Sequence, residues 1–446
     1  MDDALVIFTP SGKRARVAKG TSVLQAARQM GVDLDSVCGG RGICSKCQVS
    51  VGQGEFAKHG VTVAADALTP INAVEERYDR VRGLKTGRRL GCQACIQGDV
   101  VLDVPPESQV HKQVIRKSAS ERVMEMDPAV RVYLVDVPEP DMHEPLGDFQ
   151  RLAAAPEEAF GIKGLEADLA MMSKLQPVLR KGEWKVTVVL NKGNHDARPR
   201  IVDIFPGFHD GAIHGLAIDL GSTTIAAHLC DLRDGSVLAS SGVMNQQIRF
   251  GEDLMSRVSF VMMNPGGEVE LTNAIRAALN EMINGLVTKA DIDVQRILEI
   301  TIVGNPIMHH IVLGIDPTPL GMAPFVLATS ESVSGWANEL DLKLPNASYY
   351  VGPCIAGHVG ADTAAAILAE GPHRSSEMQL LVDIGTNAEI VLGNTEKQFA
   401  ASSPTGPAFE GAQISAGQRA TAGAIEHVRI DRETLEPRVK VIGSDL

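Results

Sequence analysis

Four cysteines constrain the fold of this chain more than any other feature. Cys38, Cys44 and Cys47 lie within ten residues, in the segment C-G-G-R-G-I-C-S-K-C, and Cys92 follows 45 positions after Cys47 in L-G-C-Q. Four thiolates, three from one loop and one from a distant strand, are the ligand set of a 2Fe–2S cluster. The spacing therefore predicts a domain that transfers single electrons.

Three glycines in the cysteine loop support this interpretation. Gly39, Gly40 and Gly42 allow positive φ values and let backbone N–H groups point at the sulfur atoms. Such donors stabilise the reduced, more negative cluster and so tune its potential. The C-x5-C-x2-C spacing resembles that of adrenodoxin-like ferredoxins, whose fourth ligand lies in a similar L-G-C-Q segment.

Zinc is the alternative occupant of these cysteines. Cys44-x2-Cys47 and Cys92-x2-Cys95 resemble two zinc knuckles. Zinc ribbons, however, space such pairs by about 15–20 residues, and a zinc site would leave Cys38 unused. Cys95 could also replace Cys92 as the fourth cluster ligand, although the L-G-C-Q segment favours Cys92.

The residues around the loop predict a β-grasp domain over 1–110, a mixed sheet crossed by one helix. A hairpin turns at Ser11 and Gly12, and a helix capped by Thr21 or Ser22 ends at Gly31. Further elements are expected as a strand over 47–51, a helix over 70–83 opened by Thr69-Pro70, and a closing strand over 99–104.

Composition limits the other function classes. The chain of 446 residues is long enough for about three domains, and its net charge of −13 argues against general nucleic-acid binding. No apolar run approaches the ~18 residues of a membrane span, and the N-terminus lacks the pattern of a signal peptide. Cysteines arranged for a cluster predict a cytoplasmic location.

The middle of the chain predicts a linker over 111–127 and a small α+β domain over 128–206. A strand near 130, two helical patterns and two further strands make up this domain. It contains no catalytic constellation, so its expected role is spacing or dimerisation, and a homodimer is one candidate assembly.

An internal duplication begins after residue 207. The segments L-A-I-D-L-G-S-T-T-I at 216–225 and L-V-D-I-G-T-N-A-E-I at 381–390 are both apolar strands that end in Asp-x-Gly-Ser or Asp-x-Gly-Thr. One such match arises by chance, but two at a domain-sized interval of 164 residues favour a repeated structural unit. Ordinary hairpin turns are the alternative explanation.

The chemistry of both turns suits phosphate binding. Glycine lets the backbone approach a phosphate, and N–H groups and hydroxyls donate to its oxygens. An aspartate at each strand end can hold hydrated Mg²⁺. The turns resemble the phosphate loops of the actin, sugar-kinase and Hsp70 superfamily. The resemblance implies that ATP is bound by Asp219, Gly221, Ser222, Thr223 and Thr224 of the first loop and by Asp383, Gly385, Thr386 and Asn387 of the second.

Five further residues are weaker candidates. Asn305, in V-G-N-P, could face a nucleotide or cap the following helix. His309 and His310 suggest a metal site, although neighbouring helix positions point about 100° apart. Asp362 follows a glycine-rich turn and is a cleft candidate, and so is Glu410 in G-P-A-F-E-G.

Taken together, the chain resembles the reductive activators of corrinoid proteins. The motifs that carry the resemblance are C-G-G-R-G-I-C-S-K-C, R-L-G-C-Q, I-D-L-G-S-T-T, V-G-N-P-I-M-H-H, G-H-V-G-A-D-T and V-D-I-G-T-N-A-E. The resemblance implies ATP-dependent transfer of one electron from the cluster to the Co(II) corrinoid protein of a methyltransferase system, which regenerates Co(I). An external electron donor would reduce the cluster.

Three other functions fit parts of the sequence: an ATP-coupled donor to another low-potential enzyme, a ferredoxin joined to a small-molecule kinase, and a non-catalytic redox or nucleotide sensor. The fold class is multidomain α/β, with an actin-like, ribonuclease H-like ATPase domain over 207–446. An adenosine-binding segment is not recognisable before the final G-S-D-L, so this domain is expected to be incomplete at its C-terminus.

Overall fold

The computed structural model describes residues 3–32, 34–36, 38, 40–44, 46–56, 59–105, 108, 126–192, 198–209, 211–251, 253–406 and 423–443. Gly39, Glu410 and residues 111–125 of the expected linker lie outside the described residues. Among the helices in the described part of the chain, none is long and apolar enough to cross a membrane.

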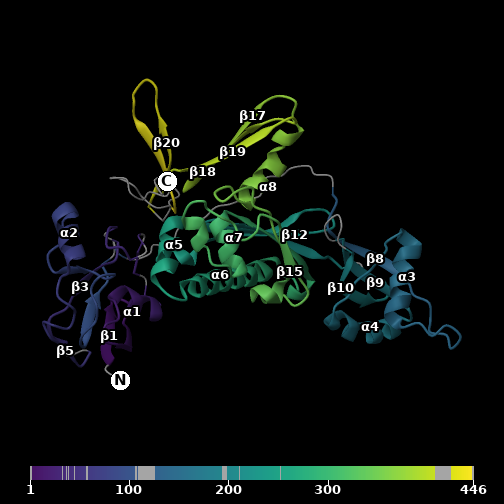
Figure 1. Ribbon diagram of the computed structural model, residues 1–446, viewed down its shortest axis with the longest axis horizontal. Helices are drawn as coiled ribbons and strands as arrows, with labels where there is room; N and C mark the ends of the chain where they lie inside the picture. The colour runs from purple at the N-terminus through teal and green to yellow at the C-terminus, as the bar shows by residue number, and fades with distance from the viewer. Residues whose placement is uncertain are drawn as a thin grey trace.

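The N-terminal domain, at one end of the molecule in Figure 1, is built on a five-stranded sheet in the order β2-β1-β7-β3-β6. β1 pairs with β7 in parallel, and the other neighbours pair antiparallel. This mixed sheet confirms the predicted ferredoxin-like fold. Its elements are β1 (Asp3–Thr9), β2 (Lys13–Ala18), α1 (Val23–Gln29), β3 (Gln48–Val51), β4 (Gly54–Phe56), β5 (Val61–Val63), α2 (Ala73–Arg82), β6 (Arg88–Leu90) and β7 (Val100–Asp103).

Side-chain caps decide where the two helices of this domain begin. Ser22, rather than Thr21, caps α1 by accepting a hydrogen bond from the Gln25 N–H. The predicted start of α2 at residue 70 is wrong by three residues. Asn72 caps α2 instead, in a capping box with Glu75, because its side chain accepts two of the free N–H groups of the first turn.

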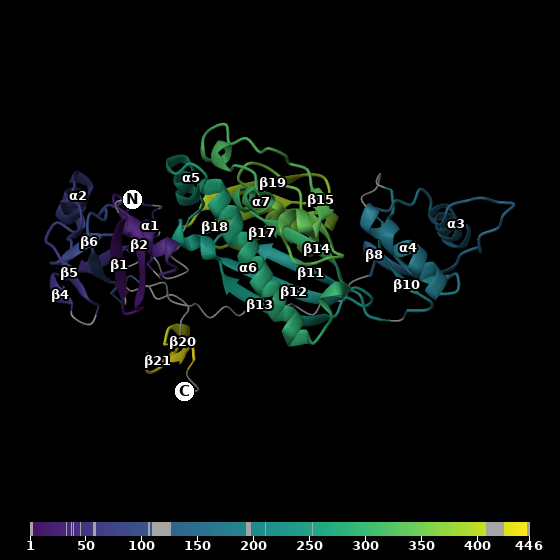
Figure 2. The same ribbon diagram turned by 90° about the horizontal axis from the view of Figure 1, so that it is seen from below.

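The small α+β domain has a three-stranded antiparallel sheet in the order β10-β9-β8, covered by two helices. Figures 1 and 2 place it at the opposite end of the molecule from the cluster domain, with the ATPase domain between them. Its elements are β8 (Val130–Asp136), α3 (Asp148–Phe160), α4 (Leu169–Lys181), β9 (Lys185–Asn191) and β10 (Arg200–Pro206).

The ATPase domain begins with a six-stranded sheet in the order β13-β12-β11-β14-β16-β15, crossed by the long helix α6 (Figure 2). Apolar residues of α6 at helical spacing, such as Ile275, Leu279 and Leu286, are fully buried against this sheet. The elements are β11 (His214–Leu220), β12 (Thr224–Asp231), β13 (Val237–Met244), η2 (Gln246–Arg249), α5 (Leu254–Met263), α6 (Gly267–Ala290), η3 (Val294–Arg296), β14 (Ile297–Gly304), α7 (Pro306–Leu313), η4 (Thr318–Gly321), β15 (Val333–Trp336), η5 (Ala337–Leu340) and β16 (Ser348–Val351).

A second, smaller sheet follows helix α8 and carries the second phosphate loop. Its strands pair antiparallel in the order β17-β18-β19, and a separate hairpin of β20 and β21 follows. These last elements are α8 (Ala361–Glu370), η6 (Pro372–Arg374), β17 (Gln379–Ile384), β18 (Asn387–Gly393), β19 (Gln398–Pro404), β20 (Ile425–Ile430) and β21 (Pro437–Val441).

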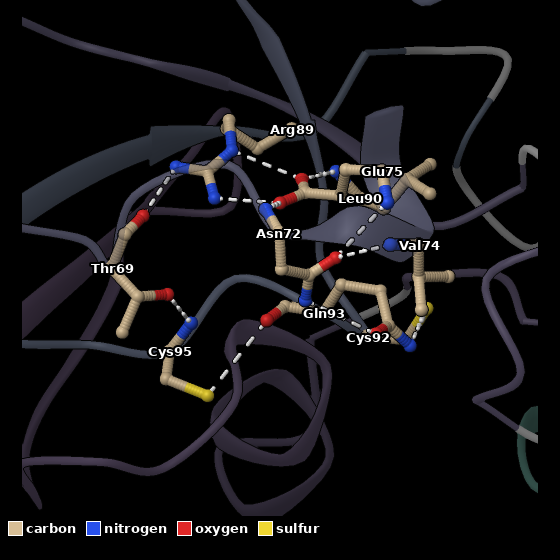
Figure 3. A network of polar contacts seen from close by, with 9 residues as sticks. All are labelled: Thr69, Asn72, Val74, Glu75, Arg89, Leu90, Cys92, Gln93 and Cys95. Atoms are coloured by element: carbon tan, nitrogen blue, oxygen red, sulfur yellow. Dashed lines mark hydrogen bonds and ion pairs between the residues drawn. The ribbon is translucent and has the colours of Figure 1, made fainter. Parts of the chain in front are cut away.

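A buried ion pair fixes the strand that leads to Cys92 (Figure 3). The Glu75 carboxylate, 0% exposed, accepts hydrogen bonds from Arg89 Nε at 3.0 Å and Nη2 at 2.7 Å. It also accepts from the Leu90 N–H at 3.0 Å, and Arg89 Nη1 donates to the Thr69 carbonyl at 2.8 Å. Helix α2 is thereby joined to β6, two residues before Cys92.

We predict that Glu75→Gln destabilises the cluster domain by about 3–5 kcal/mol, because Arg89 then loses its buried carboxylate partner. Glu76→Gln is the matched control, since Glu76 is the exposed neighbour in the same first turn. It should change the free energy of unfolding by less than about 0.5 kcal/mol. Urea titration followed by hydrogen exchange of the β3 and β7 amides checks this, and equal effects of the two changes would refute the structural role of the pair.

Candidate functional site

The four predicted cluster cysteines lie together as two pairs of thiols. In the first pair, a hydrogen bond from Cys44 lowers the pKa of Cys38 to about 5. In the second, a hydrogen bond between Cys47 and Cys92 lowers the pKa of Cys92 and raises that of Cys47. Charge interactions also connect Cys92 with Cys38 and Cys47 with Cys44, so the two pairs are neighbours.

Backbone N–H groups point at these sulfur atoms. Those of Gly40, Ile43 and Cys44 favour the thiolate of Cys38, and that of Gly42 favours the thiolate of Cys92. Gly40 and Gly42 have φ values of +92° and +70°, in the left-handed region that glycine enters at little cost. The turn therefore directs donors inward, as the glycine pattern predicts.

Cys92 and Cys95 have different surroundings (Figure 3). The sulfur of Cys92 accepts a contact of 3.6 Å from Gln93 Nε2 and faces Cys47. The sulfur of Cys95 instead contacts the Gln93 carbonyl at 3.8 Å, and its N–H donates to Thr69 Oγ1 at 3.0 Å. This geometry supports Cys92, rather than Cys95, as the fourth ligand.

Gly91 explains how the second pair forms across two strands. Its N–H donates to the Cys47 carbonyl at 2.8 Å, and its own carbonyl accepts from the Leu24 N–H at 2.8 Å. A Cβ at this position would lie 2.9 Å from the Cys47 carbonyl oxygen and 3.2 Å from Leu34 Cδ2. The close approach of these two backbones therefore requires glycine.

The donor set fits a two-iron cluster. A 2Fe–2S cluster needs four thiolates, and two neighbouring pairs offer two to each iron. The zinc alternative, which joins Cys44 and Cys47 to Cys92 and Cys95, would leave Cys38 unused and does not match the pairing of Cys92 with Cys47.

The two predicted phosphate loops meet in the ATPase domain. Thr223 Oγ1 of the first loop and Thr386 Oγ1 of the second are 3.0 Å apart, although they are 163 positions apart in the chain. In the first loop, a Cβ on Gly221 would lie 2.4 Å from the Thr224 carbonyl oxygen. In the second, Gly385 closes the turn by donating to the Asn387 carbonyl at 2.8 Å.

Carboxylates gather beside the two loops. Burial, together with the negative charges of Asp219 and Asp383, raises the pKa of Asp362 to about 6. Burial also raises the pKa of Glu389, with Asp362 as the next cause. The charges of these acids therefore interact beside the two predicted phosphate loops. Asp362 was a predicted candidate, whereas Glu389 was missed although it lies in the quoted V-D-I-G-T-N-A-E segment.

The other candidates serve the fold of helix α7. Asn305 caps α7, because its Oδ1 accepts from the Met308 N–H at 3.0 Å. His310 is held at both nitrogens: Nδ1 lies 2.9 Å from the Pro306 carbonyl, and Nε2 accepts from the Ala328 N–H at 2.9 Å. Burial lowers the pKa of His309 to about 4, and its ring centroid is 5.4 Å from that of His310.

Two residues that support the first loop were missed by the sequence motifs. Asn245 Nδ2 donates to the Gly221 carbonyl at 2.9 Å, and Arg257 donates to the Ser222 carbonyl. Both side chains are fully buried, at 0% exposure. Neither belongs to a repeated pattern, so only their contacts reveal them.

Four protein-family models match this chain in succession. Residues 7–97 match a 2Fe-2S iron-sulfur cluster binding domain, and residues 119–211 match the RACo linker region. Residues 214–375 match the RACo middle region, and residues 377–446 match the C-terminal domain of RACo, the ASKHA domain.

Two curated relatives and one solved structure resemble the chain. The corrinoid activation enzyme RamQ of Eubacterium limosum is 28% identical over 95% of this chain and 65% of its own length. The [Co(II) methylated amine-specific corrinoid protein] reductase of Methanosarcina barkeri is 28% identical over 49% of this chain and 41% of its own. The chain thus spans about two thirds of the length of RamQ and about two fifths of the length of the reductase.

The solved structure is a reductive activator for corrinoid, iron-sulfur protein. It superposes with a TM-score of 0.67 at 29% identity, over 99% of this chain and 69% of its own. The successive domain models and this shared architecture confirm the family resemblance seen in the sequence. The chain therefore has the domain architecture of the RACo family, in which a 2Fe–2S domain is followed by the RACo linker region, the RACo middle region and the C-terminal ASKHA domain.

Proposed function

We propose that this chain is an ATP-dependent reductive activator, which passes one electron from a 2Fe–2S cluster to the Co(II) corrinoid protein of a methyltransferase system. One observation carries the proposal: a chain with two facing pairs of cysteine thiols also brings two phosphate loops within 3.0 Å at Thr223 and Thr386. The names of the relatives supply the class of acceptor, a corrinoid protein.

In this proposal Cys38, Cys44, Cys47 and Cys92 hold the cluster. When bound, the cluster supplies a single electron: Co(II) gains it and becomes Co(I), the cluster is oxidised, and a low-potential external donor restores it. The N–H donors of the cysteine loop stabilise negative charge on the thiolates. Four cysteines assigned to a cluster rather than to disulfides favour a reducing, cytoplasmic location.

The phosphate loops bind Mg·ATP in the proposal. Backbone N–H groups and the hydroxyls of Ser222, Thr223 and Thr386 would hold the phosphates, while Asp219 and Asp383 would face the hydrated Mg²⁺. Nucleotide can favour electron transfer only by binding one arrangement of the protein more tightly than another. A preference of about 1.4 kcal/mol already changes the equilibrium tenfold.

An anaerobic assay tests this function directly. The chemically reduced protein is mixed with a Co(II) corrinoid protein from the same cell, and Co(I) is followed optically with and without Mg·ATP. We expect Co(I) to form only with Mg·ATP. A reducible cluster that yields no Co(I) under either condition would refute the corrinoid acceptor and favour a redox or nucleotide sensor.

We predict that Cys92→Ser lowers the iron and sulfide bound per chain to a small fraction of the wild-type amount, because the second thiol pair then loses one ligand. Cys95→Ser is the matched control, since Cys95 lies three residues later and points at the Gln93 carbonyl. It should leave the iron and sulfide content unchanged. Loss of iron and sulfide in Cys95→Ser but not in Cys92→Ser would instead identify Cys95 as the fourth ligand.

We predict that Asp219→Asn and Asp383→Asn each lower ATP-dependent reduction of the acceptor by about 10²-fold, a typical loss when one group that stabilises charge at the reacting centre is removed. The visible spectrum of the cluster should remain, because both residues lie in the ATPase domain. Asp234→Asn, at the exposed turn between β12 and β13, is the control. ATP-driven reduction at the wild-type rate in both loop variants would rule out the phosphate-loop assignment.

A further inference from the structure

The cluster domain and the ATPase domain enclose a cleft beside the cysteine loop. The cleft has a volume of about 400 Å³. The cluster domain lines it with Arg28, Gly40 and Cys92, and the ATPase domain lines it with Arg249, Phe250 and Phe260. Figures 1 and 2 show helix α1, which carries Arg28, beside the end of the ATPase domain that holds α5.

The Arg28 side chain lies between the two domains and contacts residues of the ATPase domain. Its guanidinium carbon lies 5.0 Å from the ring centroid of Phe250 and 5.2 Å from that of Phe260. Its Nη2 donates to the Arg249 carbonyl. A planar guanidinium can stack on aromatic rings and donate a hydrogen bond at the same time, which an ammonium group does less well. The contact is therefore specific for arginine.

The same guanidinium faces the cluster cysteines. Burial, together with the charge of Arg249, lowers the pKa of Arg28 to about 10 against the opposing charges of Glu270, Cys47 and Cys92, so the side chain stays charged at neutral pH. A positive charge at this position stabilises the more negative, reduced state of a bound cluster. Arg28 belongs to the cluster domain, so its charge stays beside the cluster whether or not the two domains are docked.

A second contact joins the cysteine loop to helix α5. Arg41 Nε donates to the Cys38 carbonyl at 3.0 Å, and its Nη2 lies 3.2 Å from Ser256 Oγ. Ser256 is fully buried and is held by Asp253, whose carboxylate accepts from the Ser256 hydroxyl at 2.9 Å. The loop that carries three cysteines is thus hydrogen-bonded to a buried serine of the ATPase domain.

The segment 245–257, which provides these contacts, also holds the first phosphate loop. Asn245 and Arg257, at the two ends of the segment, donate to the carbonyls of Gly221 and Ser222. Between them lie Arg249, Phe250 and Ser256, which contact the cluster domain. One short segment therefore contacts the phosphate loop on one side and the cluster domain on the other.

We propose that Arg28 docks the cluster domain onto segment 245–257, and that nucleotide in the first phosphate loop releases this docking. The inference rests on the proposed function of the four cysteines and the phosphate loops. In the docked state the ATPase domain covers the side of the cluster domain near Cys92, because Gly40 and Cys92 line the same cleft as Arg249 and Phe250. Release uncovers that side for the acceptor protein, while the Arg28 charge remains on the cluster domain.

The release follows from differential affinity. Because Thr223 and Thr386 already lie 3.0 Å apart, phosphates that enter between the two loops would displace the first loop and with it the carbonyls of Gly221 and Ser222, which Asn245 and Arg257 hold. Because those two side chains are buried and hydrogen-bonded, their displacement also moves segment 245–257, which contacts Arg28. Nucleotide that binds the released arrangement more tightly then shifts the population toward it.

The test compares Arg28→Gln and Arg28→Lys with Arg14→Gln, a matched change on the exposed face of strand β2. Two quantities are measured on the purified protein with and without Mg·ATP: the midpoint potential of the cluster and the radius of gyration from small-angle X-ray scattering. For the wild type and Arg14→Gln, we expect Mg·ATP to increase the radius, whereas the Arg28 charge contributes to the potential with and without Mg·ATP. A tenfold change in the reduction equilibrium corresponds to about 59 mV for one electron.

Arg28→Gln should show the larger radius without nucleotide, and Mg·ATP should not increase it further. Its potential should lie below that of the wild type with and without Mg·ATP, because the charge beside the cluster is lost, whereas Arg28→Lys should lose part of the docking but keep a potential closer to the wild type. Equal radii for Arg28→Gln and Arg14→Gln would overturn the docking role of Arg28. An unchanged radius of the wild type on addition of Mg·ATP would overturn the release.

Failure of the proposed function is distinguishable in the same samples. Iron and sulfide are measured first, and their absence would refute cluster binding itself. The scattering measurement needs no cluster, so it still decides whether Arg28 holds the two domains together.

Discussion

The buried guanidinium of Arg257 is the interaction on which the arrangement of the ATPase domain depends. This side chain is 0% exposed, and a buried charge is tolerated only when its donors are satisfied. Its acceptors include the Gly251 carbonyl at 3.0 Å and the Gln247 side chain at 3.2 Å, as well as the Ser222 carbonyl in the phosphate loop. Because these groups belong to two separate segments, the guanidinium can be satisfied only when both are in place. Ser256 and Phe260, which contact the cluster domain, lie on helix α5 together with Arg257.

The sequence predicts the parts of the molecule whose motif is repeated or whose residue spacing is set by a bound group. The four cysteines need a fixed spacing around a small inorganic core, and the loops at Asp219 and Asp383 repeat one strand–turn–strand pattern. Such patterns are local, so they are visible without a structure. The helix periodicity of α6 and the order of the ferredoxin strands were predictable for the same reason.

Contacts between domains could not be predicted in this way. Arg28 lies on a helix whose other residues follow an ordinary amphipathic pattern, and its partners Phe250 and Phe260 lie more than 200 positions away. The start of α2 was misplaced because Thr69-Pro70 and Asn72 offer competing helix starts, and the capping box with Glu75 decides between them. The short strands β4, β5 and β6 have three residues each, too few for a period-2 pattern to be distinct.

The close approach at Gly91 has a consequence for how the ligand set is assembled. Many small metal domains stay unfolded until their ion arrives, because the ligands have no other reason to meet. Here the backbone hydrogen bond between Gly91 and Cys47 aligns two of the sulfur atoms through the sheet itself. The sheet therefore holds the backbones of Cys47 and Cys92 close together independently of any bound group, so this half of the ligand set depends on the pairing of β3 with β6.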